Sequence, residues 1–298
     1  MKTFARLAVC VRLTGVRILL FILAVALAGQ AAADNIRPIR LMTRDDLELA
    51  GVYYPVATNS AAAVLLIHSY GKNHEEWGPV APLFQENGIA VLAIDLRGHG
   101  DSTRRLTADG VKTLDYHNFS PQDFTAMLLD INQAYDWLST QPGIDAKRIA
   151  VVGSSIGANL ALRYAAFNDE VAGLILLSPG IFYRNLRTDD AITHFGKRPL
   201  CIVASEDDKY ALESSKYLID LRRRAGQAVV SNELVTCSGN LHGAAMLTGV
   251  KSLSGVVFGW LEHILSLPHS QPVPDPVSSV TATNLPPSPK RVESDKHR

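Results

Sequence analysis

The chain has 298 residues, of which 47% are hydrophobic and 19% charged, and its formal net charge is zero. This composition is that of an ordinary globular protein and excludes a low-complexity or collagen-like chain. The length suits one α/β domain of roughly 230 residues with extensions at its ends.

The first 33 residues have the pattern of an export signal. Residues 1–17 contain four basic residues and no acidic one, the run 18–28 is apolar, and residues 31–33 are three alanines. A basic leader, a short apolar segment and a small-residue cleavage site describe a secretory signal peptide. The apolar run is about half the ~20 residues that a membrane span needs. We therefore expect cleavage after Ala33 and a periplasmic or secreted protein, with an uncleaved membrane anchor as the alternative.

Removal of residues 1–33 leaves 25 basic and 29 acidic residues, a net charge of −4. A broad basic surface that binds nucleic acid is therefore not expected. One basic cluster remains, Arg222-Arg223-Arg224, and it lies in an amphipathic helix pattern. We interpret this cluster as a solvated helix face.

Strand and helix patterns alternate through residues 34–267, the expected globular domain. The first two strands, Ile39–Thr43 and Leu47–Tyr54, flank an Arg-Asp-Asp turn and predict an antiparallel hairpin. The later strands are predicted at 63–68, 89–95, 149–152, 171–177, 200–204 and 229–236, and the helices at 79–87, 124–138, 156–167, 211–225 and 253–265. Continuous apolar strands separated by helices predict an α/β fold, with a mostly parallel central sheet and helices on both faces.

The two cysteines of this domain, Cys201 and Cys237, lie at the start of one predicted strand and the end of another. If those strands are parallel, the thiols lie at opposite ends of the sheet, too far apart for a disulfide. We expect two separate thiols.

Residues 268–298 differ from the rest of the chain. Seven of these 31 residues are proline, and the apolar periodicity stops. Such a segment buries too little apolar surface to offset its ordering entropy, so we predict a disordered Pro-rich tail.

The sequence Gly153-Ser154-Ser155-Ile156-Gly157 fits the pattern G-x-S-x-G. It directly follows a predicted strand and opens a predicted helix. A sharp turn in this setting projects the central serine hydroxyl, and the glycines let neighbouring backbones approach. The helix N-terminus favours negative charge beside the serine. We predict that Ser155 is a nucleophile and expect its neighbour Ser154 to be inert.

A nucleophilic serine needs a base, and the base needs a carboxylate that orients it. After an elbow of this type, the acid precedes the histidine along the chain. Glu206, Asp207 and Asp208 follow one predicted strand, and His242 follows the next. We predict His242 as the base and Asp208 as the acid, with Asp207 and then Glu206 as alternatives.

Two backbone N–H groups are needed to stabilise a developing oxyanion. One is expected from Ile156, the residue after the nucleophile. The other is expected from the loop after the strand at 63–68, where Tyr70 is the first candidate and Ser69 the second.

These features resemble the α/β-hydrolase superfamily, within its dienelactone-hydrolase-like and serine-aminopeptidase-like members. The resemblance covers residues 40–266 and is carried by the His68–Gly71 turn, the segment Asp95–Ser102, the Gly153–Gly157 elbow, Asp208 and His242. It implies the α/β-hydrolase fold and a serine hydrolase. Two positions depart from the family pattern: Ser69 replaces a glycine of the oxyanion loop, and Ser205 replaces a glycine three residues before the acid.

The segment Asp95–Ser102 is interpreted as architecture. Gly98 and Gly100 suit a turn, while Asp95 and Arg97 are expected to bind backbone groups or each other. His99 is open to two interpretations, a structural histidine or a substrate contact.

No metal or cofactor is expected. The nine histidines are scattered, His74-Glu75-Glu76 lacks a second helical ligand, and no Gly-rich phosphate loop follows a strand.

The reaction expected from this constellation is cleavage of a carboxylic ester through an acyl-enzyme. Only about twenty residues separate Leu177 from Leu200, and they and Thr103–Pro121 are the segments available for a small cap. Small-molecule esters are the expected substrates. A serine aminopeptidase or amidase is the alternative, with Asp189 and Asp190 as possible ligands for a substrate ammonium. A non-catalytic binding protein of the cell envelope, on the same fold, is the third possibility.

Overall fold

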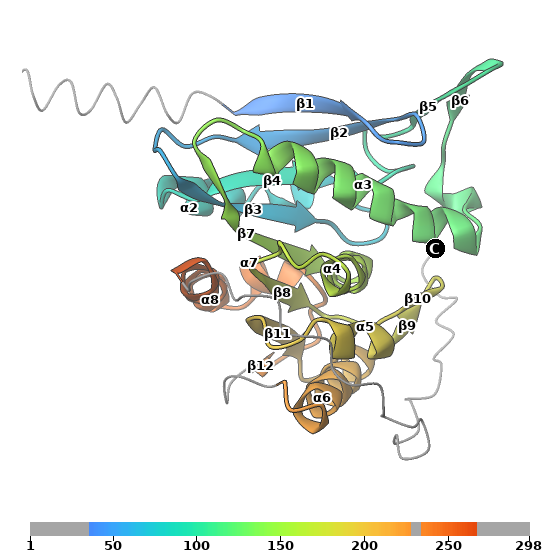
Figure 1. The fold of residues 1–298 in the computed structure, drawn as a ribbon. Coiled ribbons are helices and arrows are strands. Elements are labelled where there is room, and N and C mark those ends of the chain that lie inside the picture. The colour runs from blue at the N-terminus through green and yellow to red at the C-terminus, as the bar shows by residue number, and fades with distance from the viewer. Residues whose placement is uncertain (1–35, 228–233, 267–298) are drawn as a thin grey trace, which may run out of the picture.

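The computed structural model describes residues 36–227 and 234–266 (Figure 1). Ten strands of this part form one sheet. They are β1 (Arg37–Met42), β2 (Leu47–Tyr54), β3 (Ala61–Ile67), β4 (Ala90–Ile94), β5 (Arg104–Thr107), β6 (Gly110–Thr113), β7 (Ile144–Ser154), β8 (Gly173–Leu177), β11 (Leu200–Ser205) and β12 (Leu234–Cys237). Their order is β12-β11-β8-β7-β3-β4-β2-β5-β6, with β1 paired to β2.

The sheet is mostly parallel, as predicted. Strands β12, β11, β8, β7, β3 and β4 run parallel to one another. Strand β2 is antiparallel to both β4 and β1, so the predicted N-terminal hairpin is confirmed. The carboxyl ends of the parallel strands meet at one edge of the sheet, where loops that bear functional groups gather.

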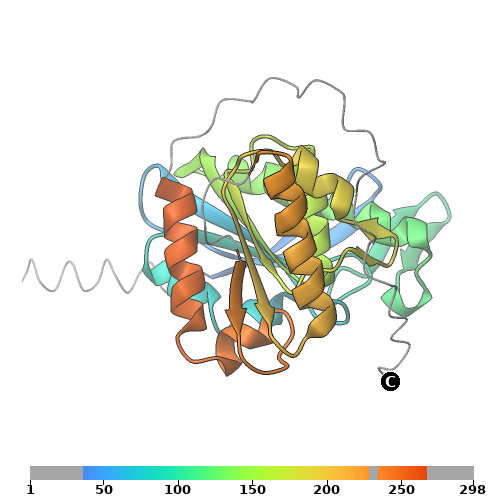
Figure 2. The same cartoon turned by 90° about the horizontal axis from the view of Figure 1, so that it is seen from below.

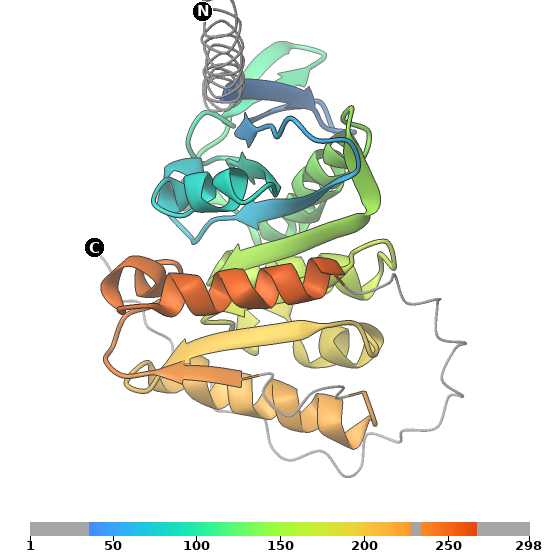
Figure 3. The ribbon, with the colours of Figure 1, turned by 90° about the vertical axis from the view of Figure 1, so that its left-hand side faces the viewer.

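Helices cover both faces of the sheet. They are α2 (Ala81–Glu86), α3 (Pro121–Ser139), α4 (Ile156–Ala166), α5 (Asp189–His194), α6 (Lys209–Arg224), α7 (Ala245–Gly249) and α8 (Leu253–Ser266), with 3₁₀ turns η1 (His74–Trp77) and η2 (Tyr116–Asn118). Helices α3, α4, α5 and α6 share one core cluster, and α2, α7 and α8 share the other. Figure 2 shows α6 and α8 on opposite sides of the sheet, and Figure 3 shows α2 and α8 in front of it.

Strand β3 shows why these residues form a central strand. All seven of its residues are buried. Ala63, Leu65 and Ile67 face the core under α3 and α4, whereas Val64 and Leu66 face the core under α2 and α8. A strand covered on both faces needs apolar residues at every position, because successive side chains point to opposite faces.

Two short hairpins were not predicted from the sequence. Strands β5 and β6 extend the sheet beyond β2 and are largely exposed, with Leu106 and Val111 on their surface (Figure 1). Strands β9 (Phe182–Tyr183) and β10 (Leu186–Arg187) form a separate hairpin before α5. Both hairpins lack the buried alternation that marks a strand in the sequence. The segment between Leu177 and Leu200 also contains the short helix α5.

The prediction for the basic cluster is wrong at one of its three positions. Arg223 and Arg224 are exposed, but Arg222 is fully buried. Its guanidinium lies 5.4 Å from the centre of the Phe195 ring and donates to the Arg198 carbonyl. The long side chain reaches from α6 into the core, which a count of charges along the helix does not show.

Cys201 and Cys237 are separate buried thiols, as predicted. Ser205, at the end of β11, is the neighbour of Cys237 in the register of β11 and β12. Cys201 therefore lies four residues before the level of Cys237.

The expected signal peptide, residues 1–33, and the expected tail, 268–298, lie outside the described residues, as does the start of the strand predicted at 229–236. Within 36–227 and 234–266, no helix has the length and hydropathy of a membrane span.

Candidate active site

Ser155 occupies a sharp turn between β7 and α4. Strand β7 ends at Ser154 and α4 begins at Ile156, and Ser155 itself has φ 55° and ψ −116°. A positive φ strains a residue other than glycine and occurs mainly where the surroundings impose it. The Ser155 N–H donates to the Leu177 carbonyl at 2.8 Å, which ties this turn to the end of β8.

The two glycines of the elbow are required by close backbone contacts. A Cβ on Gly153 would lie 2.2 Å from the Gly157 carbonyl oxygen, and one on Gly157 would lie 2.3 Å from the Ile67 carbonyl oxygen. Since both neighbours are backbone atoms, neither has room to move aside. The G-x-S-x-G pattern therefore reflects the packing of β7, α4 and the end of β3.

His242 connects Ser155 to Asp208. The Nε2 atom of His242 lies 2.7 Å from the Ser155 Oγ, and its Nδ1 atom lies 2.5 Å from the Asp208 Oδ2. The His242 side chain is 49% exposed and that of Asp208 is 16% exposed, so the imidazole faces solvent while the carboxylate is sheltered. Three residues from three distant parts of the chain thus form one hydrogen-bonded row.

The structure brings only one of the three candidate carboxylates to His242. Asp208 is the N-cap of α6, and its Oδ1 accepts the Ala211 N–H at 3.3 Å while Oδ2 faces His242. Asp207 is exposed and pairs with Lys209 at 3.6 Å. Glu206 is exposed as well. The hydrogen bond from the Ala211 N–H holds the Asp208 carboxylate in place, so its second oxygen has a defined direction.

Three serines hold the loop 238–244 that carries His242, hereafter the His242 loop. They end or directly follow the neighbouring strands β7, β8 and β11. The Ser205 Oγ donates to the Leu241 carbonyl at 2.6 Å, the Gly243 N–H donates to the Ser178 Oγ at 2.9 Å, and the Ala244 N–H donates to the Ser154 Oγ at 2.7 Å. These structural roles were not predicted from the sequence, in which Ser154 was only expected not to act as the nucleophile. The sequence feature that could have indicated these roles is the serine at or just after the end of each strand.

The loop after β3 is held by a neutral histidine. The Leu96 N–H donates to His68 Nε2 at 2.9 Å, so Nδ1 carries the proton and donates to the Ser69 carbonyl at 2.7 Å. Burial, together with the nearby His99, lowers the pKa of His68 to about 3. A ring that stays neutral keeps this tautomer, and with it the path of the loop.

Of the two candidates for the second oxyanion amide, Tyr70 has the available N–H. The Ser69 N–H donates to the Glu76 carboxylate at 2.8 Å. Within the described residues, the N–H groups of Tyr70 and Ile156 have no hydrogen-bond acceptor. Ile156 also opens α4, whose N-terminal dipole favours negative charge.

Aromatic side chains surround Tyr70. Its ring centre lies 5.0 Å from that of Tyr116, 6.1 Å from that of Phe124 and 6.2 Å from that of Tyr183. The guanidinium of Arg184 lies 5.0 Å from the Tyr70 ring centre. These residues belong to η2, α3 and the β9–β10 hairpin, so both segments expected to cap the site contribute.

The segment Asp95–Ser102 is architectural. The Asp95 carboxylate accepts the N–H groups of His74 and Asp101 at 2.7 and 2.9 Å. His99 is buried and stacks on Tyr116 with ring centres 4.0 Å apart, and its Nδ1 lies 2.9 Å from the Arg97 carbonyl. These contacts make His99 a structural histidine.

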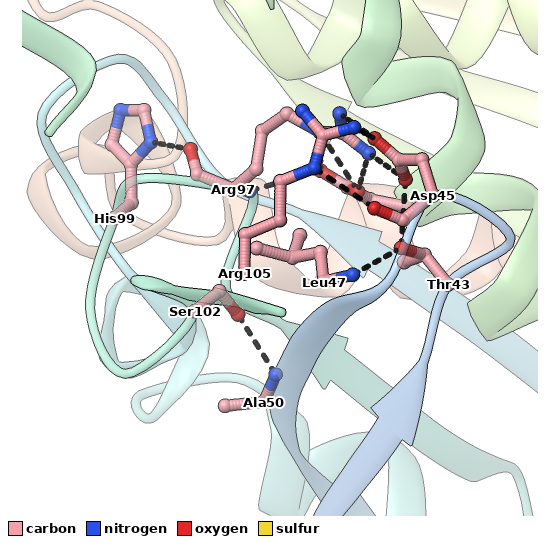
Figure 4. A network of polar contacts seen from close by, with 9 residues as sticks. Thr43, Asp45, Leu47, Ala50, Arg97, His99, Ser102 and Arg105 are labelled. Carbon is pink, nitrogen blue, oxygen red and sulfur yellow. Dashed lines mark hydrogen bonds and ion pairs between the residues drawn. The ribbon is translucent and has the colours of Figure 1, made fainter. Parts of the chain in front are cut away.

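Arg97 pairs with two aspartates from other elements and not with Asp95. Its guanidinium lies 2.7 Å from Asp130 on α3. It also lies 2.8 Å from Asp45 in the β1–β2 turn (Figure 4). Burial alone would lower the pKa of Arg97, but the charge and hydrogen bonds of Asp130 and Asp45 outweigh it and raise that pKa. The buried cluster joins the loop after β4 to α3 and to the β1–β2 turn.

Metal ligands are not gathered in the part of the chain that the structure describes: no three His, Cys, Asp or Glu side chains there are arranged to hold an ion. His74, the first residue of the rejected His-Glu-Glu candidate, instead bonds to Asp95 through Nδ1 at 2.7 Å.

Comparison with known proteins agrees with this architecture. An uncharacterized protein of Mycobacterium tuberculosis is 29% identical over 144 residues, which are 48% of this chain and 45% of that protein. A polyketide transferase of Penicillium is 30% identical over 142 residues (47% and 44%), and a thiohydrolase of Aspergillus aculeatus is 31% identical over 144 residues (47% and 41%). The matched region thus spans less than half the length of these curated relatives.

Solved structures share the fold at low sequence identity. An esterase of Pyrococcus furiosus superposes with a TM-score of 0.62 at 17% identity, covering 80% of this chain and 94% of the esterase. An alpha/beta hydrolase of Penicillium gives 0.63 at 16% identity, covering 78% and 99%. Residues 62–214, just over half of the sequence, match the family described as alpha/beta hydrolase fold. The chain belongs to the alpha/beta hydrolase fold family.

Proposed function

We propose that this protein is a serine hydrolase that cleaves carboxylic esters through an acyl-enzyme. The observation that carries the proposal is the row Asp208–His242–Ser155, with contacts of 2.5 and 2.7 Å at an exposed edge of the sheet. A serine hydroxyl becomes a useful nucleophile when a neighbouring base removes its proton and a carboxylate orients that base.

In the first half of the reaction, the Ser155 Oγ attacks the ester carbonyl carbon while its proton passes to His242 Nε2. The carbonyl π pair moves onto oxygen, where the N–H groups of Tyr70 and Ile156 stabilise the negative charge. The intermediate then collapses, the bond to the alcohol oxygen breaks, and His242 returns the proton to the departing alcohol. Asp208 holds the imidazole by Nδ1 and stabilises its positive charge.

In the second half, water repeats the same steps on the acyl-enzyme. His242 takes one proton from the water, the hydroxide oxygen bonds to the acyl carbon, and the same two amides stabilise the oxyanion. The bond to the Ser155 Oγ breaks, the proton returns to that oxygen, and the carboxylic acid leaves. The 49% exposure of the His242 side chain supports this step, because water has access to the base.

The ion pairs of the cap favour esters over substrates with a free ammonium group. Asp189 pairs with Arg187, and Asp190 lies 3.5 Å from Arg163, so both candidate ammonium ligands have cationic partners. Because both aspartates already have cationic partners, neither is left to bind a substrate ammonium, and this disfavours the aminopeptidase alternative.

The relatives support acyl transfer as the class of chemistry. One is named a polyketide transferase and another a thiohydrolase. The substrates to screen are therefore short and medium acyl esters, with the matching acyl thioesters beside them.

The test is fluorophosphonate labelling of residues 34–298, with the modified peptide located by mass spectrometry. We expect label on Ser155, and none on folded Ser155→Ala or His242→Ala variants. Turnover of a p-nitrophenyl ester should fall by roughly 10⁴-fold or more in both variants, as it does when a nucleophile or its base is removed. Well-folded wild-type protein that neither labels nor turns over the ester panel would instead favour a non-catalytic binding protein.

Export to the periplasm or medium is part of the proposal and rests on the pattern of residues 1–33. The intact mass of protein recovered from the exported fraction tests it: cleavage gives a chain that begins at Asp34, whereas an anchored protein keeps the leader and stays with the membrane.

A further inference from the structure

A row of hydrogen bonds joins Glu76 to the His242 loop. The N–H and the Oγ of Ser69 both donate to the Glu76 carboxylate, at 2.8 Å each. The Ser69 Oγ lies 2.7 Å from the Ser154 Oγ, and the Ala244 N–H donates to that same Ser154 Oγ at 2.7 Å. Both serines are buried, so protein groups and not bulk water satisfy them.

The direction of these hydrogen bonds is fixed by the carboxylate. An ionised carboxylate only accepts, so the single hydroxyl hydrogen of Ser69 points to Glu76. The hydrogen between the two serines must then come from Ser154. The row therefore runs from the Ala244 N–H through Ser154 and Ser69 to Glu76, and every hydroxyl in it donates once. In a buried setting such bonds polarise and strengthen one another.

The three members of the row other than Glu76 are close in sequence to residues of the proposed site. Ser69 precedes Tyr70, Ser154 precedes Ser155, and Ala244 lies two residues after His242.

Gly243 allows the His242 loop to rest directly on these hydroxyls. A Cβ at this position would lie 2.4 Å from the Ser154 Oγ and 3.1 Å from the Ser69 Oγ, and the backbone has φ +60°. A glycine in place of Ser69 would have no hydroxyl and would break the row.

We propose that Glu76 is a positioning residue, which holds the Tyr70 amide, the Ser155 elbow and the His242 loop in one arrangement through Ser69 and Ser154. This inference rests on the proposed function, and Glu76 itself does not touch the substrate.

Burial raises the pKa of Glu76, while hydrogen bonds from Ser69 and the charges of Lys72 and His242 oppose that rise. The hydrogen bonds that oppose the rise are the same ones through which Glu76 holds Ser69.

The test is Glu76→Gln, with Glu75→Gln as the matched control. Glutamine keeps the size of Glu76, but its NH₂ group donates toward the Ser69 Oγ. The Ser69 hydroxyl hydrogen would then turn to the Ser154 Oγ, which leaves the Ser154 hydroxyl without its acceptor. Glu75 lies on the same 3₁₀ turn, is exposed, and hydrogen-bonds to Asn73 outside the row. With a p-nitrophenyl ester, Glu76→Gln should lower kcat by about 10- to 100-fold and leave KM within about twofold, because misplaced reacting groups cost rate. Glu75→Gln should resemble wild type.

A double-mutant cycle tests whether the effect passes through the serines. If Glu76 acts through Ser154, the Glu76→Gln/Ser154→Ala double variant should be no slower than the slower single variant. Losses that multiply, or a wild-type kcat in folded Glu76→Gln, would overturn the proposal.

Hydrogen exchange gives a readout that does not need turnover. In Glu76→Gln the Ala244 amide should exchange several-fold faster, and in Glu75→Gln it should not. If wild type fails to label at Ser155 but the exchange responds, the hydrolase proposal fails and the link to the His242 loop stands. If Ser155 labels normally and Glu76→Gln changes neither kcat nor exchange, the positioning role alone is wrong.

Discussion

Two buried polar networks follow neighbouring strands of the same sheet, and they are built differently. After β4, Arg97 is held between Asp130 and Asp45 in a cluster of full charges. After β3, Ser69 joins Ser154 to Glu76 through hydroxyl groups that end on one carboxylate. The first network joins the loop after β4 to α3 and to the β1–β2 turn. The second contains the chain neighbours of Tyr70 and Ser155, on which the proposed chemistry depends.

The contrast indicates what each network does for the protein. Buried charges are costly to leave unpaired, so removing one member of the Arg97 cluster should lower stability most. A buried hydroxyl that loses one hydrogen-bond partner costs less folding free energy than a buried charge that loses its partner. Hydroxyls do, however, fix the direction of the groups they join. Changes in the Ser69–Ser154 row should therefore lower rate more than stability.

The largest expected effect belongs to neither network and concerns Asp208, the acid of the proposed catalytic residues. Asp208→Asn should lower kcat by roughly 10³- to 10⁴-fold, because an amide holds the imidazole in the wrong tautomer. Steady-state kinetics on an activated ester measures this.

Asp207→Asn is the matched control, since Asp207 is exposed and pairs with Lys209. It should change kcat less than about twofold, as surface ion pairs contribute little. Equal losses in the two variants would mean that the acid is not fixed at Asp208.

Next in size is the stability effect of the Arg97 cluster. Arg97→Met should lower the free energy of unfolding by about 3–5 kcal/mol, because Asp130 would remain buried without its partner. Urea denaturation followed by circular dichroism measures it.

Arg104→Met is the control for that variant, because its ion pair with Glu48 at 3.2 Å is on the surface, with the arginine side chain 58% exposed. It should cost no more than about 1 kcal/mol. A similar cost for both variants would remove the distinction between the buried cluster and an ordinary surface pair.

The smallest effect is a pH trend at Glu76. Because burial raises the pKa of Glu76 above its unfolded value, the folded state holds the proton more tightly. The stability of wild type is thus reduced as pH rises from the unfolded pKa of Glu76 through its higher folded pKa, whereas Glu76→Gln lacks the ionisation. Relative to wild type, Glu76→Gln should therefore gain stability as pH rises from about 4, the usual pKa range of a glutamate. Thermal melts at a series of pH values from about 4 upward measure the trend, and a flat or opposite difference would contradict it.

Much of the fold followed from local patterns in the sequence. The apolar strands and the elbow motif have short-range signals, and they predicted the parallel sheet, the leading hairpin and the placement of Ser155 between β7 and α4. The exposed β5–β6 hairpin has no such signal and was missed. Arg222 was misjudged because the direction of a long side chain depends on what packs above it.

The sequence by itself determined which residue types stand at the carboxyl ends of the strands, because strand periodicity and chain order are local properties. Only the tertiary structure decided which of three adjacent carboxylates faces His242, and that Ser154, Ser178 and Ser205 hold its loop. These choices depend on the direction of single side chains across strands that are neighbours in space and distant in sequence. The same reason applies to Glu76, which is linked to Ser154 and Ala244 through Ser69 and so to distant parts of the chain.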